Sequence, residues 1–236
     1  MRKLVIIPTY NEKENVAAMI DKVLSLDGNY NLLFVDDGSP DGTADIIREK
    51  QKQCPESISL ICRSGKLGLG TAYIAGFKWA LESNYDLNFE MDCDFSHNPD
   101  DLKRLTARLE ADADVAIGSR YVRGVNVVNW PLSRLLMSYF ASKYVKIVTG
   151  MPVCDATAGF VGYRAEVLRT IDLDRVQMIG YGFQIEMKYT AWKHKFRIAE
   201  ESIIFVDREA GTSKMSSGIF GEAFFGVLKL PFRKFN

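Results

Sequence analysis

The sequence of 236 residues has little of what defines several protein classes. Its four cysteines are widely spaced and form no C-x-x-C pair, which favours reduced thiols in a cytosolic protein over a disulfide framework or a zinc site. No apolar run approaches about 18 residues, so we expect no transmembrane helix. The apolar run at the N-terminus ends at Pro8, too early for a signal peptide.

The chain also has no excess of charge of either sign, but its charged residues are unevenly distributed along the sequence. Lys and Arg together number 30, as do Asp and Glu, so nothing in the net charge indicates a nucleic-acid partner. Between Val115 and Cys154 there is no acidic residue. The basic residues of that stretch are Arg120, Arg123, Arg134, Lys143 and Lys146. The stretch is a candidate for holding phosphate, although these side chains also fit a solvated surface.

Short apolar runs alternate with amphipathic segments through the first half of the chain. The runs expected as strands are 4–7, 31–35, 59–61, 87–91 and 114–118. The segments expected as helices are 14–26, 44–53, a stretch from Thr71 through Leu81, and 100–110. This alternation predicts an α/β fold with a mostly parallel, twisted sheet flanked by helices. In the second half we expect a helix over 132–148, a loop and strand over 153–163, a helix beginning near Phe183, and a strand over 203–206.

Polar loops follow several of the expected strands. They contain Tyr10-Asn11-Glu12, Asp36-Asp37, Asp92-Cys93-Asp94 and Ser119-Arg120. Ligands of open parallel sheets bind beyond the carboxyl ends of the strands, so we expect these loops to meet at one site.

Asp92 and Asp94 form the most informative of these loops. Side chains at positions i and i+2 of an extended segment point to the same side. Two adjacent carboxylates repel each other unless a cation joins them. Oxygen ligands suit Mg²⁺ or Mn²⁺, which complete their coordination with substrate phosphates. A lone Asp-x-Asp also fits a solvated acidic turn, so only further motifs in the chain can distinguish a metal site from such a turn.

Six segments in order resemble the family 2 glycosyltransferases and, more narrowly, the dolichyl-phosphate (polyprenyl-phosphate) mannosyltransferases. They are Ile7-Pro8-Thr9-Tyr10-Asn11-Glu12, Val35-Asp36-Asp37-Gly38-Ser39-Pro40-Asp41-Gly42-Thr43, Gly68-Leu69-Gly70-Thr71-Ala72-Tyr73, Met91-Asp92-Cys93-Asp94-Phe95-Ser96-His97-Asn98-Pro99, Ile117-Gly118-Ser119-Arg120-Tyr121 and Phe205-Val206-Asp207-Arg208. The resemblance implies the glycosyltransferase A fold. It also implies a single catalytic domain over residues 1–215, followed by an apolar and basic tail over 216–236.

The resemblance also implies roles for individual residues. Those expected to line the nucleotide base and ribose pocket are Pro8, Tyr10, Glu12, Val35 and Asp37. Those expected to contact the sugar nucleotide are Asp92, Cys93 and Asp94, where Cys93 replaces the family's usual alanine. Asp94 is the expected metal ligand, Asp92 is a second candidate, and Ser96 stands where some relatives use glutamine.

The remaining implied roles concern phosphate groups. Arg120, Arg208 and Lys214 would hold phosphates, and Arg134 and Ser138 stand where relatives contact the lipid phosphate. The expected catalytic set is Asp94, Arg120 and Arg208. His97, Asp155 and the segment Gln184-Ile185-Glu186 are open between a role at the site and hydrogen-bonded structure.

The implied reaction is the metal-dependent, inverting transfer of mannose from GDP-mannose to dolichyl or polyprenyl phosphate. Such a transfer passes through an oxocarbenium-like state. The lipid phosphate is already ionised near pH 7, because its second pKa is about 6, so it needs no strong general base. This agrees with a chain that has only two histidines. The alternatives are glucosyl transfer from UDP-glucose to the same lipid and a non-catalytic subunit that binds a sugar nucleotide.

A polyprenyl acceptor requires contact with a membrane. The expected helix over 132–148 is amphipathic, with Arg and Lys beside an apolar stripe, and fits either an interfacial helix or a core helix. The tail over 216–236 is rich in Phe and Leu and basic near its end, so it could lie on a membrane or dock to a membrane-anchoring subunit. We therefore expect a cytoplasmic protein that is peripheral at the cytoplasmic face of a membrane.

Overall fold

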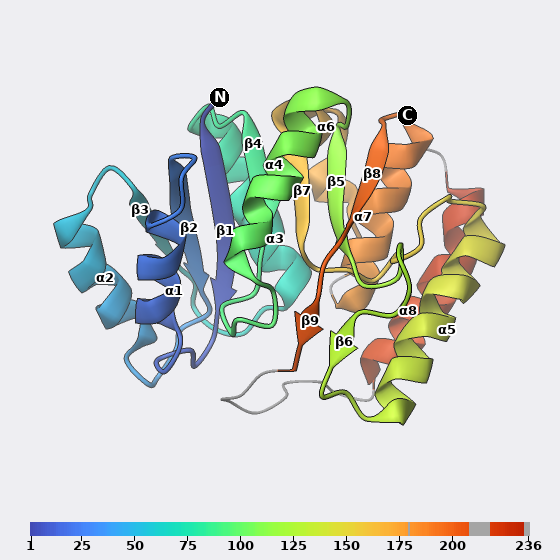
Figure 1. Cartoon of the computed structure of the whole chain (residues 1–236), viewed down its shortest axis with the longest axis horizontal. Coiled ribbons are helices and arrows are strands. Elements are labelled where there is room, and N and C mark those ends of the chain that lie inside the picture. Colours follow the sequence, from blue (N-terminus) through green and yellow to red (C-terminus); the bar gives the residue numbers. More distant parts are fainter. Residues whose placement is uncertain (179, 208–217, 234–236) are drawn as a thin grey trace.

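A computed structural model describes residues 1–178, 180–207 and 218–233, without the side chains of residues 181 and 218–223. A seven-stranded sheet runs through the centre in the order β3-β2-β1-β4-β7-β5-β8 (Figure 1). Its strands are β1 (Lys3–Thr9), β2 (Tyr30–Asp36), β3 (Ile58–Cys62), β4 (Leu87–Glu90), β5 (Val115–Ser119), β7 (Val161–Arg164) and β8 (Ile198–Ser202). All neighbouring strands are parallel except β7, which is antiparallel to β4 and β5. The expected mostly parallel sheet is confirmed.

Helices cover both faces of the sheet (Figure 1). One face packs against α1 (Val16–Leu24), α2 (Thr43–Gln53) and α4 (Leu102–Ala111). The other face packs against α3 (Leu69–Glu82), α6 (Ala165–Thr170) and α7 (Tyr181–Lys193). Short 3-10 turns occupy Pro99–Asp101, Leu173–Arg175 and Leu230–Phe232.

Strand β1 shows why its apolar run is continuous. Leu4 and Ile6 face the core layer that contains α3 and α7, whereas Val5 and Ile7 face the layer that contains α1 and α4. All four side chains have no exposed area. Burying each contributes about 1.5–3 kcal/mol, so a strand covered on both faces favours apolar residues at every position.

The second half departs from the expected elements at one strand. The strand expected over 203–206 is wrong in its limits, because the sheet strand is β8 (Ile198–Ser202) and only β9 (Phe205–Val206) falls in that range. β9 pairs with β6 (Val127–Val128) in a separate two-stranded sheet. β8 contains Glu200 and Glu201 and pairs only with β5, so this edge strand lacks the apolar run of a central strand.

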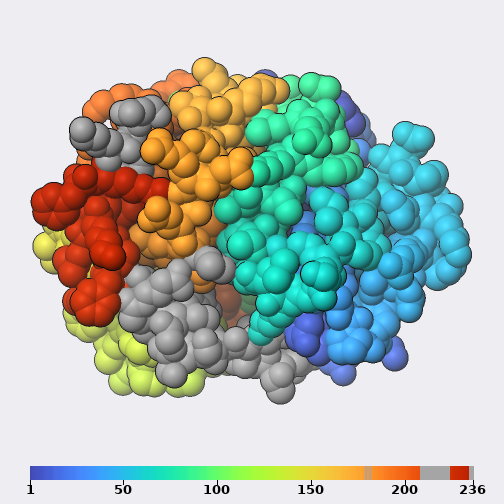
Figure 2. Space-filling view, turned by 180° about the vertical axis from the view of Figure 1, so that it is seen from behind, coloured from blue at the N-terminus to red at the C-terminus, as the bar shows by residue number. Residues whose placement is uncertain are grey.

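Two helices lie at the end of the molecule opposite α2, as both views show (Figures 1 and 2). They are α5 (Leu132–Thr149) and α8 (Gly218–Lys229). Within α5 only Ser142, Val145 and Thr149 are buried, so the core-helix alternative for this segment is wrong. The apolar residues exposed on these helices and on the 3-10 turn after α8 form what we call the end-helix surface: Leu132, Leu136, Met137, Phe140, Ile147, Phe224, Phe225, Leu228 and Phe232.

The C-terminal segment is nevertheless fixed to the domain. Val227 and Leu230 are each 1% exposed and belong to the main core. Arg233 forms an ion pair with Glu186 of α7, which also accepts a hydrogen bond from the main-chain N–H of Met178. Glu186 therefore has a structural role here. The expected boundary between residues 215 and 216 lies outside the described residues.

Candidate active site

A cavity of about 940 Å³ lies where the carboxyl ends of the strands meet the end helices. The lining residues from the loops after β4 and β5 are Asp92, Asp94, Ser96, His97 and Arg120. Those from α5 and α8 include Arg134, Leu136, Met137, Ser138, Phe140, Ala141, Tyr144, Val145, Phe224 and Val227. The cavity thus has a polar side with two carboxylates and a largely apolar side formed by helices.

The loop after β4 brings both aspartates to the cavity wall. Asp94 Oδ1 accepts a hydrogen bond from the main-chain N–H of Ser96 at 3.1 Å. Between Asp94 and Ser96, Phe95 has a φ of 58°, a left-handed conformation that costs a bulky residue roughly 1–2 kcal/mol. Cys93 is 2% exposed and packs in the core, so its side chain takes the place of the family's small residue without reaching the cavity. Strain held at this turn indicates that the loop's geometry serves a site.

The chemistry of this loop fits a divalent cation that is shared with a substrate. No group of three His, Cys, Asp or Glu side chains that could hold a metal occurs among the described residues. Mg²⁺ and Mn²⁺ commonly take only one or two carboxylates and complete their shell with phosphates and water. Ser96 Oγ is buried, lines the cavity and has no hydrogen-bond partner within the described part of the chain. Asp94, Asp92 and Ser96 therefore fit a partial metal site.

His97 is placed as a structural residue. Its ring lies 5.1 Å from the Phe160 ring and 5.2 Å from the Phe205 ring. Nδ1 accepts a hydrogen bond from the main-chain N–H of Asp92 at 3.4 Å. Burial lowers the pKa of His97 to about 4, so the imidazole is neutral at physiological pH. The histidine orients the aspartate loop, as the hydrogen-bonding alternative for it predicts.

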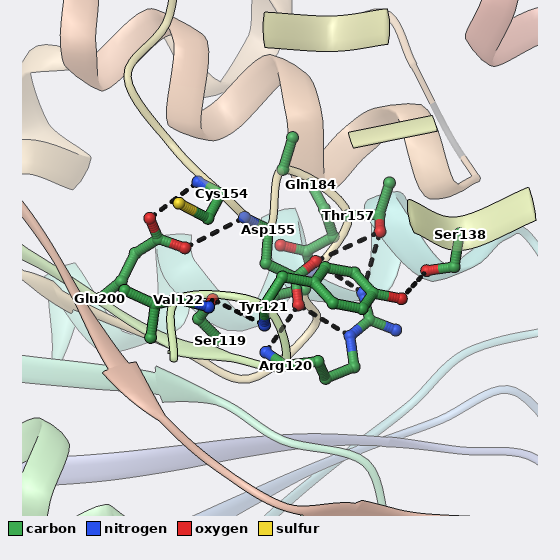
Figure 3. A network of polar contacts seen from close by, with 12 residues as sticks. Ser119, Arg120, Tyr121, Val122, Ser138, Cys154, Asp155, Thr157, Gln184 and Glu200 are labelled. Atoms are coloured by element: carbon green, nitrogen blue, oxygen red, sulfur yellow. Dashed lines mark hydrogen bonds and ion pairs between the residues drawn. The ribbon is translucent and has the colours of Figure 1, made fainter. Parts of the chain in front are cut away.

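Arg120 reaches the cavity in a tight pair with Asp155 (Figure 3). Its Nε lies 2.7 Å from Oδ2 of Asp155 and its Nη2 lies 2.6 Å from Oδ1, while the main-chain N–H of Arg120 donates to the same carboxylate. Thr157 Oγ1 accepts a further hydrogen bond from Nη2 at 2.9 Å. Burial alone would raise the pKa of Asp155, but Arg120 outweighs it and holds the pKa below its usual value. The positive charge of Arg120, which is expected to bind phosphate, is therefore already paired with Asp155.

Arg134 and Ser138 lie on the first turns of α5 and both line the cavity. Arg134 pairs with Asp207 at 2.7 Å and its guanidinium lies 4.1 Å from the centre of the Trp130 ring. Ser138 Oγ accepts a hydrogen bond from the hydroxyl of Tyr121 at 2.8 Å (Figure 3). The two residues expected at the lipid phosphate thus share one wall with Arg120. Arg208 and Lys214 lie outside the described residues.

A second polar group lies at the ends of β2 and β3. Asp37 is 6% exposed and its Oδ1 lies 2.6 Å from Nε of Arg63. Burial raises the pKa of Asp37, although Arg63 opposes the rise. Arg63 also donates to Thr71 Oγ1 and to the main-chain oxygen of Gly68. Arg63 thereby joins the expected nucleotide loop to the start of α3.

The other expected nucleotide residues lie at the end of β1 or just after it, apart from Val35 on β2. Lys66 Nζ lies 5.4 Å from the centre of the Tyr10 ring, and the main-chain N–H of Glu12 donates to Thr43 Oγ1. Pro8 is half-buried near the end of β1. Val35 has no exposed area and packs in the core, so only its backbone is left to meet a nucleotide. These residues do not line the large cavity, so the structure does not bring them together with Asp92 and Asp94 in a single pocket.

Sequence reasoning missed three side chains of these sites. Arg63 and Lys66 directly follow β3, and the rule that ligands gather beyond strand ends would have found them. Tyr73 lines the cavity from α3; it ends one of the six family-like segments, but the resemblance gave it no role, and its apolar helical neighbours give it the pattern of a core residue. Only the folded arrangement distinguishes it.

Sequence comparisons agree with the site. A family model described as "Glycosyl transferase family 2" matches residues 4–172. The "Polyprenol monophosphomannose synthase" of Mycolicibacterium smegmatis is 45% identical over 98% of this chain and 88% of its own length. The "Undecaprenyl-phosphate mannosyltransferase" of Micrococcus luteus is 46% identical over 97% of this chain and 93% of its own.

Solved structures agree with the fold. Glucosyl-3-phosphoglycerate synthase from Mycobacterium tuberculosis, in complex with Mn²⁺, UDP and glucosyl-3-phosphoglycerate, has a TM-score of 0.67 at 16% identity, covering 97% of this chain and 79% of that one. A mannosyltransferase from Pyrobaculum calidifontis in complex with GDP-Man and Mn²⁺ has a TM-score of 0.59 at 16% identity, covering 97% and 69%. The chain belongs to glycosyl transferase family 2 and is a glycosyltransferase with the glycosyltransferase A fold.

Proposed function

We propose that this enzyme transfers mannose from GDP-mannose to a polyprenyl phosphate, with a divalent cation and with inversion at the sugar. The observation that carries the proposal is the single cavity with Asp92 and Asp94 on one side and the apolar faces of α5 and α8 on the other. The names of two relatives of 45% and 46% identity, a polyprenol monophosphomannose synthase and an undecaprenyl-phosphate mannosyltransferase, support the same donor sugar and acceptor class.

The donor belongs at the aspartate loop. Asp94 and Asp92 would hold Mg²⁺ or Mn²⁺, which neutralises the negative charge that grows on the leaving diphosphate. The hydrogen bond from Ser96 N–H and the packing of His97 fix this loop before substrate arrives. Arg208 and Lys214 would assist by binding the diphosphate, and the nucleotide would extend toward Asp37 and Tyr10.

The acceptor phosphate belongs on the wall formed by Arg120, Arg134 and Ser138. Arginine binds phosphate with a planar, bidentate fork. Both arginines are already oriented, one by Asp155 and the other by Asp207. They would offset the repulsion between the two phosphorylated substrates, and the polyprenyl chain would leave along the apolar helices.

No residue has to remove a proton from the nucleophile. The acceptor oxygen is ionised at neutral pH, because the second pKa of a phosphate monoester is about 6. His97 is neutral, buried and already bonded through Nδ1 to the aspartate loop, which fits a structural role. The residues of the site would therefore act by holding charge and geometry.

We also propose that the end-helix surface rests on the cytoplasmic face of a membrane. Ile147 is 82% exposed and Phe232 is 87% exposed, an arrangement that is costly in water. Lys143, Lys146 and Lys229 lie exposed on the same helices and suit anionic lipid head groups. Across the described ranges no helix is both long and apolar enough to cross a bilayer. A membrane-anchoring subunit docking on this surface is the alternative occupant.

Radiolabelled transfer tests the proposed function. Purified protein, polyprenyl phosphate and Mn²⁺ are incubated with labelled GDP-mannose or with labelled UDP-glucose, and the solvent-extractable lipid is counted. We expect label from GDP-mannose, none when the metal is chelated, and at most a small fraction from UDP-glucose. Label from UDP-glucose alone would show that the proposed donor sugar is wrong. Binding without any product would indicate a non-catalytic subunit.

A further inference from the structure

Four polar side-chain atoms on the cavity wall are buried and have no hydrogen-bond partner among the described residues. Ser96 Oγ belongs to the candidate metal site, and Trp130 Nε1 belongs to a half-buried ring beside Arg134. The other two are Tyr73 Oη and Gln184 Nε2, on residues that are 0% and 2% exposed. Leaving such an atom unpaired costs about 1–3 kcal/mol, so a pair on one wall points to a bound molecule as the missing partner.

The orientation of the Gln184 amide is fixed by its neighbour. Lys188 Nζ lies 3.2 Å from Gln184 Oε1 and 2.7 Å from the main-chain oxygen of Ala158. An ammonium group only donates hydrogen bonds, so the amide must present its oxygen to Lys188. The NH₂ group therefore lies on the other side of the amide, where no described residue accepts from it.

Tyr73 and Gln184 lie on adjacent parts of the same wall. The Tyr73 ring of α3 stacks on the ring of Phe183, 5.9 Å away and within 8° of parallel. Phe183 directly precedes Gln184 on α7. Tyr73 and Gln184 both line the same cavity as Asp92 and Asp94. The two unpaired groups thus lie near the position expected for the donor.

We propose that Tyr73 Oη and Gln184 Nε2 form a subsite that hydrogen-bonds the hydroxyl groups of the transferred sugar. The subsite rests on the proposed function, because it assumes a sugar nucleotide held at Asp94. A phenol and an amide are neutral, which suits a sugar hydroxyl better than a phosphate. The nearest buried cation, Lys188, donates to the carbonyl oxygens of Ala156 and Ala158. A site that pairs with a substrate hydroxyl discriminates strongly against an analogue that lacks it.

Glu90 is the competing partner for the amide within the protein. It is buried on β4 beside the Gln184 amide and does not line the cavity. Neither carboxyl oxygen of Glu90, however, has a hydrogen-bond partner of ordinary geometry in the described part of the chain. By hydrogen-bond geometry, the NH₂ group of Gln184 therefore remains for the substrate.

Three substitutions test the subsite. Tyr73→Phe removes the hydroxyl on the cavity wall. Tyr163→Phe is the matched control, because its hydroxyl is equally buried and unpaired and its ring also contacts Phe77, but it does not line the cavity. Gln184→Glu keeps an oxygen for Lys188 and replaces the donor by an acceptor. Melting temperatures check that each variant is folded.

Calorimetry with Mn²⁺ measures the Kd of GDP-mannose and GDP, and of UDP-glucose and UDP. We expect Tyr73→Phe and Gln184→Glu to raise the ratio of the sugar-nucleotide Kd to the diphosphate Kd about fivefold or more, the size of one lost hydrogen bond. Tyr163→Phe should leave the ratio unchanged. An unchanged ratio in the first two variants, or an equal change in the control, overturns the subsite.

Single-deoxy analogues of GDP-mannose locate the contact. The kcat/KM penalty for one analogue should largely disappear in Tyr73→Phe, because the partner of that hydroxyl is already absent. Additive penalties for all analogues would contradict a direct contact. If the unaltered protein transfers mannose and the variants show no change in the Kd ratio or in the kcat/KM penalties, only the subsite is contradicted. Absence of transfer by the unaltered protein sinks the proposed function, while the Kd ratios still report on the subsite.

Discussion

Asp92 and Asp94 have different surroundings although they stand one residue apart. Asp94 accepts a hydrogen bond from the main chain of its own turn, at Ser96. The main-chain N–H of Asp92 is bonded to His97, whose ring is held between aromatic side chains. These differences favour Asp94 as the cation ligand and Asp92 as a contact to the sugar nucleotide.

Asp94→Ala should abolish metal-dependent binding of the nucleotide while the protein remains folded. Asp94 is not buried, so its loss leaves no gap in the core. We expect kcat/KM to fall more than 100-fold, about 2.7 kcal/mol of transition-state stabilisation. Asp100→Ala is the control, because that exposed aspartate pairs only on the surface with Lys22. Activity of Asp94→Ala within about tenfold of the unaltered protein would show that the metal assignment is wrong.

Asp155→Asn should destabilise the protein by about 3–5 kcal/mol, because it leaves the guanidinium of Arg120 buried without its counter-charge. The pKa of Asp155 lies below its usual value in the folded state. The stability from the pair is therefore complete above about pH 4 and lost as the pH falls through the folded pKa. Urea unfolding between pH 2.5 and 7 measures both effects.

Two further results test whether the Arg120–Asp155 pair causes these effects on stability. Asp45→Asn, which breaks an exposed pair with Arg48, should cost at most about 1 kcal/mol. The acid-dependent fall in stability below pH 4 should be smaller in Asp155→Asn than in the unaltered protein. An identical fall in both proteins would mean that Asp155 does not drive this part of the acid response.

Side chains could be predicted from the sequence where their partner is near in the chain. The Asp-x-Asp spacing and the loops after the strands were enough to place Asp92, Asp94 and Arg120 at one cavity. The pairing of Arg120 with Asp155 joins residues 35 apart, and no local pattern encodes it. The burial of Val35 follows from helices on both faces of the sheet, which its motif does not reveal.

Among the described helices, α5 and α8 expose the most large apolar side chains. Their apolar side chains are exposed at Phe140, Ile147 and Phe225, and Tyr144 of α5 stacks on Phe224 of α8 at 4.8 Å. The amphipathic pattern of α5 was readable from the sequence, but the exposed direction of its stripe was not. The strand β8 was misplaced for a related reason, because an edge position tolerates Glu200 and Glu201.

Replacing both Ile147 and Phe232 by Ser should weaken binding to vesicles that contain anionic lipid. Each side chain is exposed and lies off the cavity wall, and burying each in lipid would contribute about 1.5–3 kcal/mol. Cosedimentation should therefore show a loss of more than 100-fold in vesicle affinity. Leu67→Ser is the control, since Leu67 is 55% exposed but follows β3 at the opposite edge of the sheet.

Transfer to a water-soluble short-chain acceptor phosphate should not change in the double variant. This readout separates membrane contact from catalysis. Unchanged vesicle binding would leave a partner protein as the occupant of the end-helix surface. A loss as large in Leu67→Ser would show that the effect is not specific to that surface.

In the molecule as a whole, the proposed function requires two substrates of different solubility to meet in one cavity. The loop after β4 supplies the carboxylates, and α5 and α8 extend the same cavity into an apolar wall. The acid-free stretch between Val115 and Cys154 folds so that Arg120 and Arg134 lie where these two parts join. The fold class and the order of the site loops could be predicted from the sequence, whereas the closure of the cavity by α8 depends on packing between segments far apart in the chain.

The central claim is that a lipid-linked phosphate is the nucleophile. The most direct measurement compares polyprenyl phosphate, polyprenol of the same length and inorganic phosphate as acceptors of labelled mannose from GDP-mannose, with products identified by mass spectrometry. We predict a product only from polyprenyl phosphate, with mannose attached through the phosphate oxygen. Equal transfer to polyprenol, or to inorganic phosphate without a lipid chain, would contradict the account.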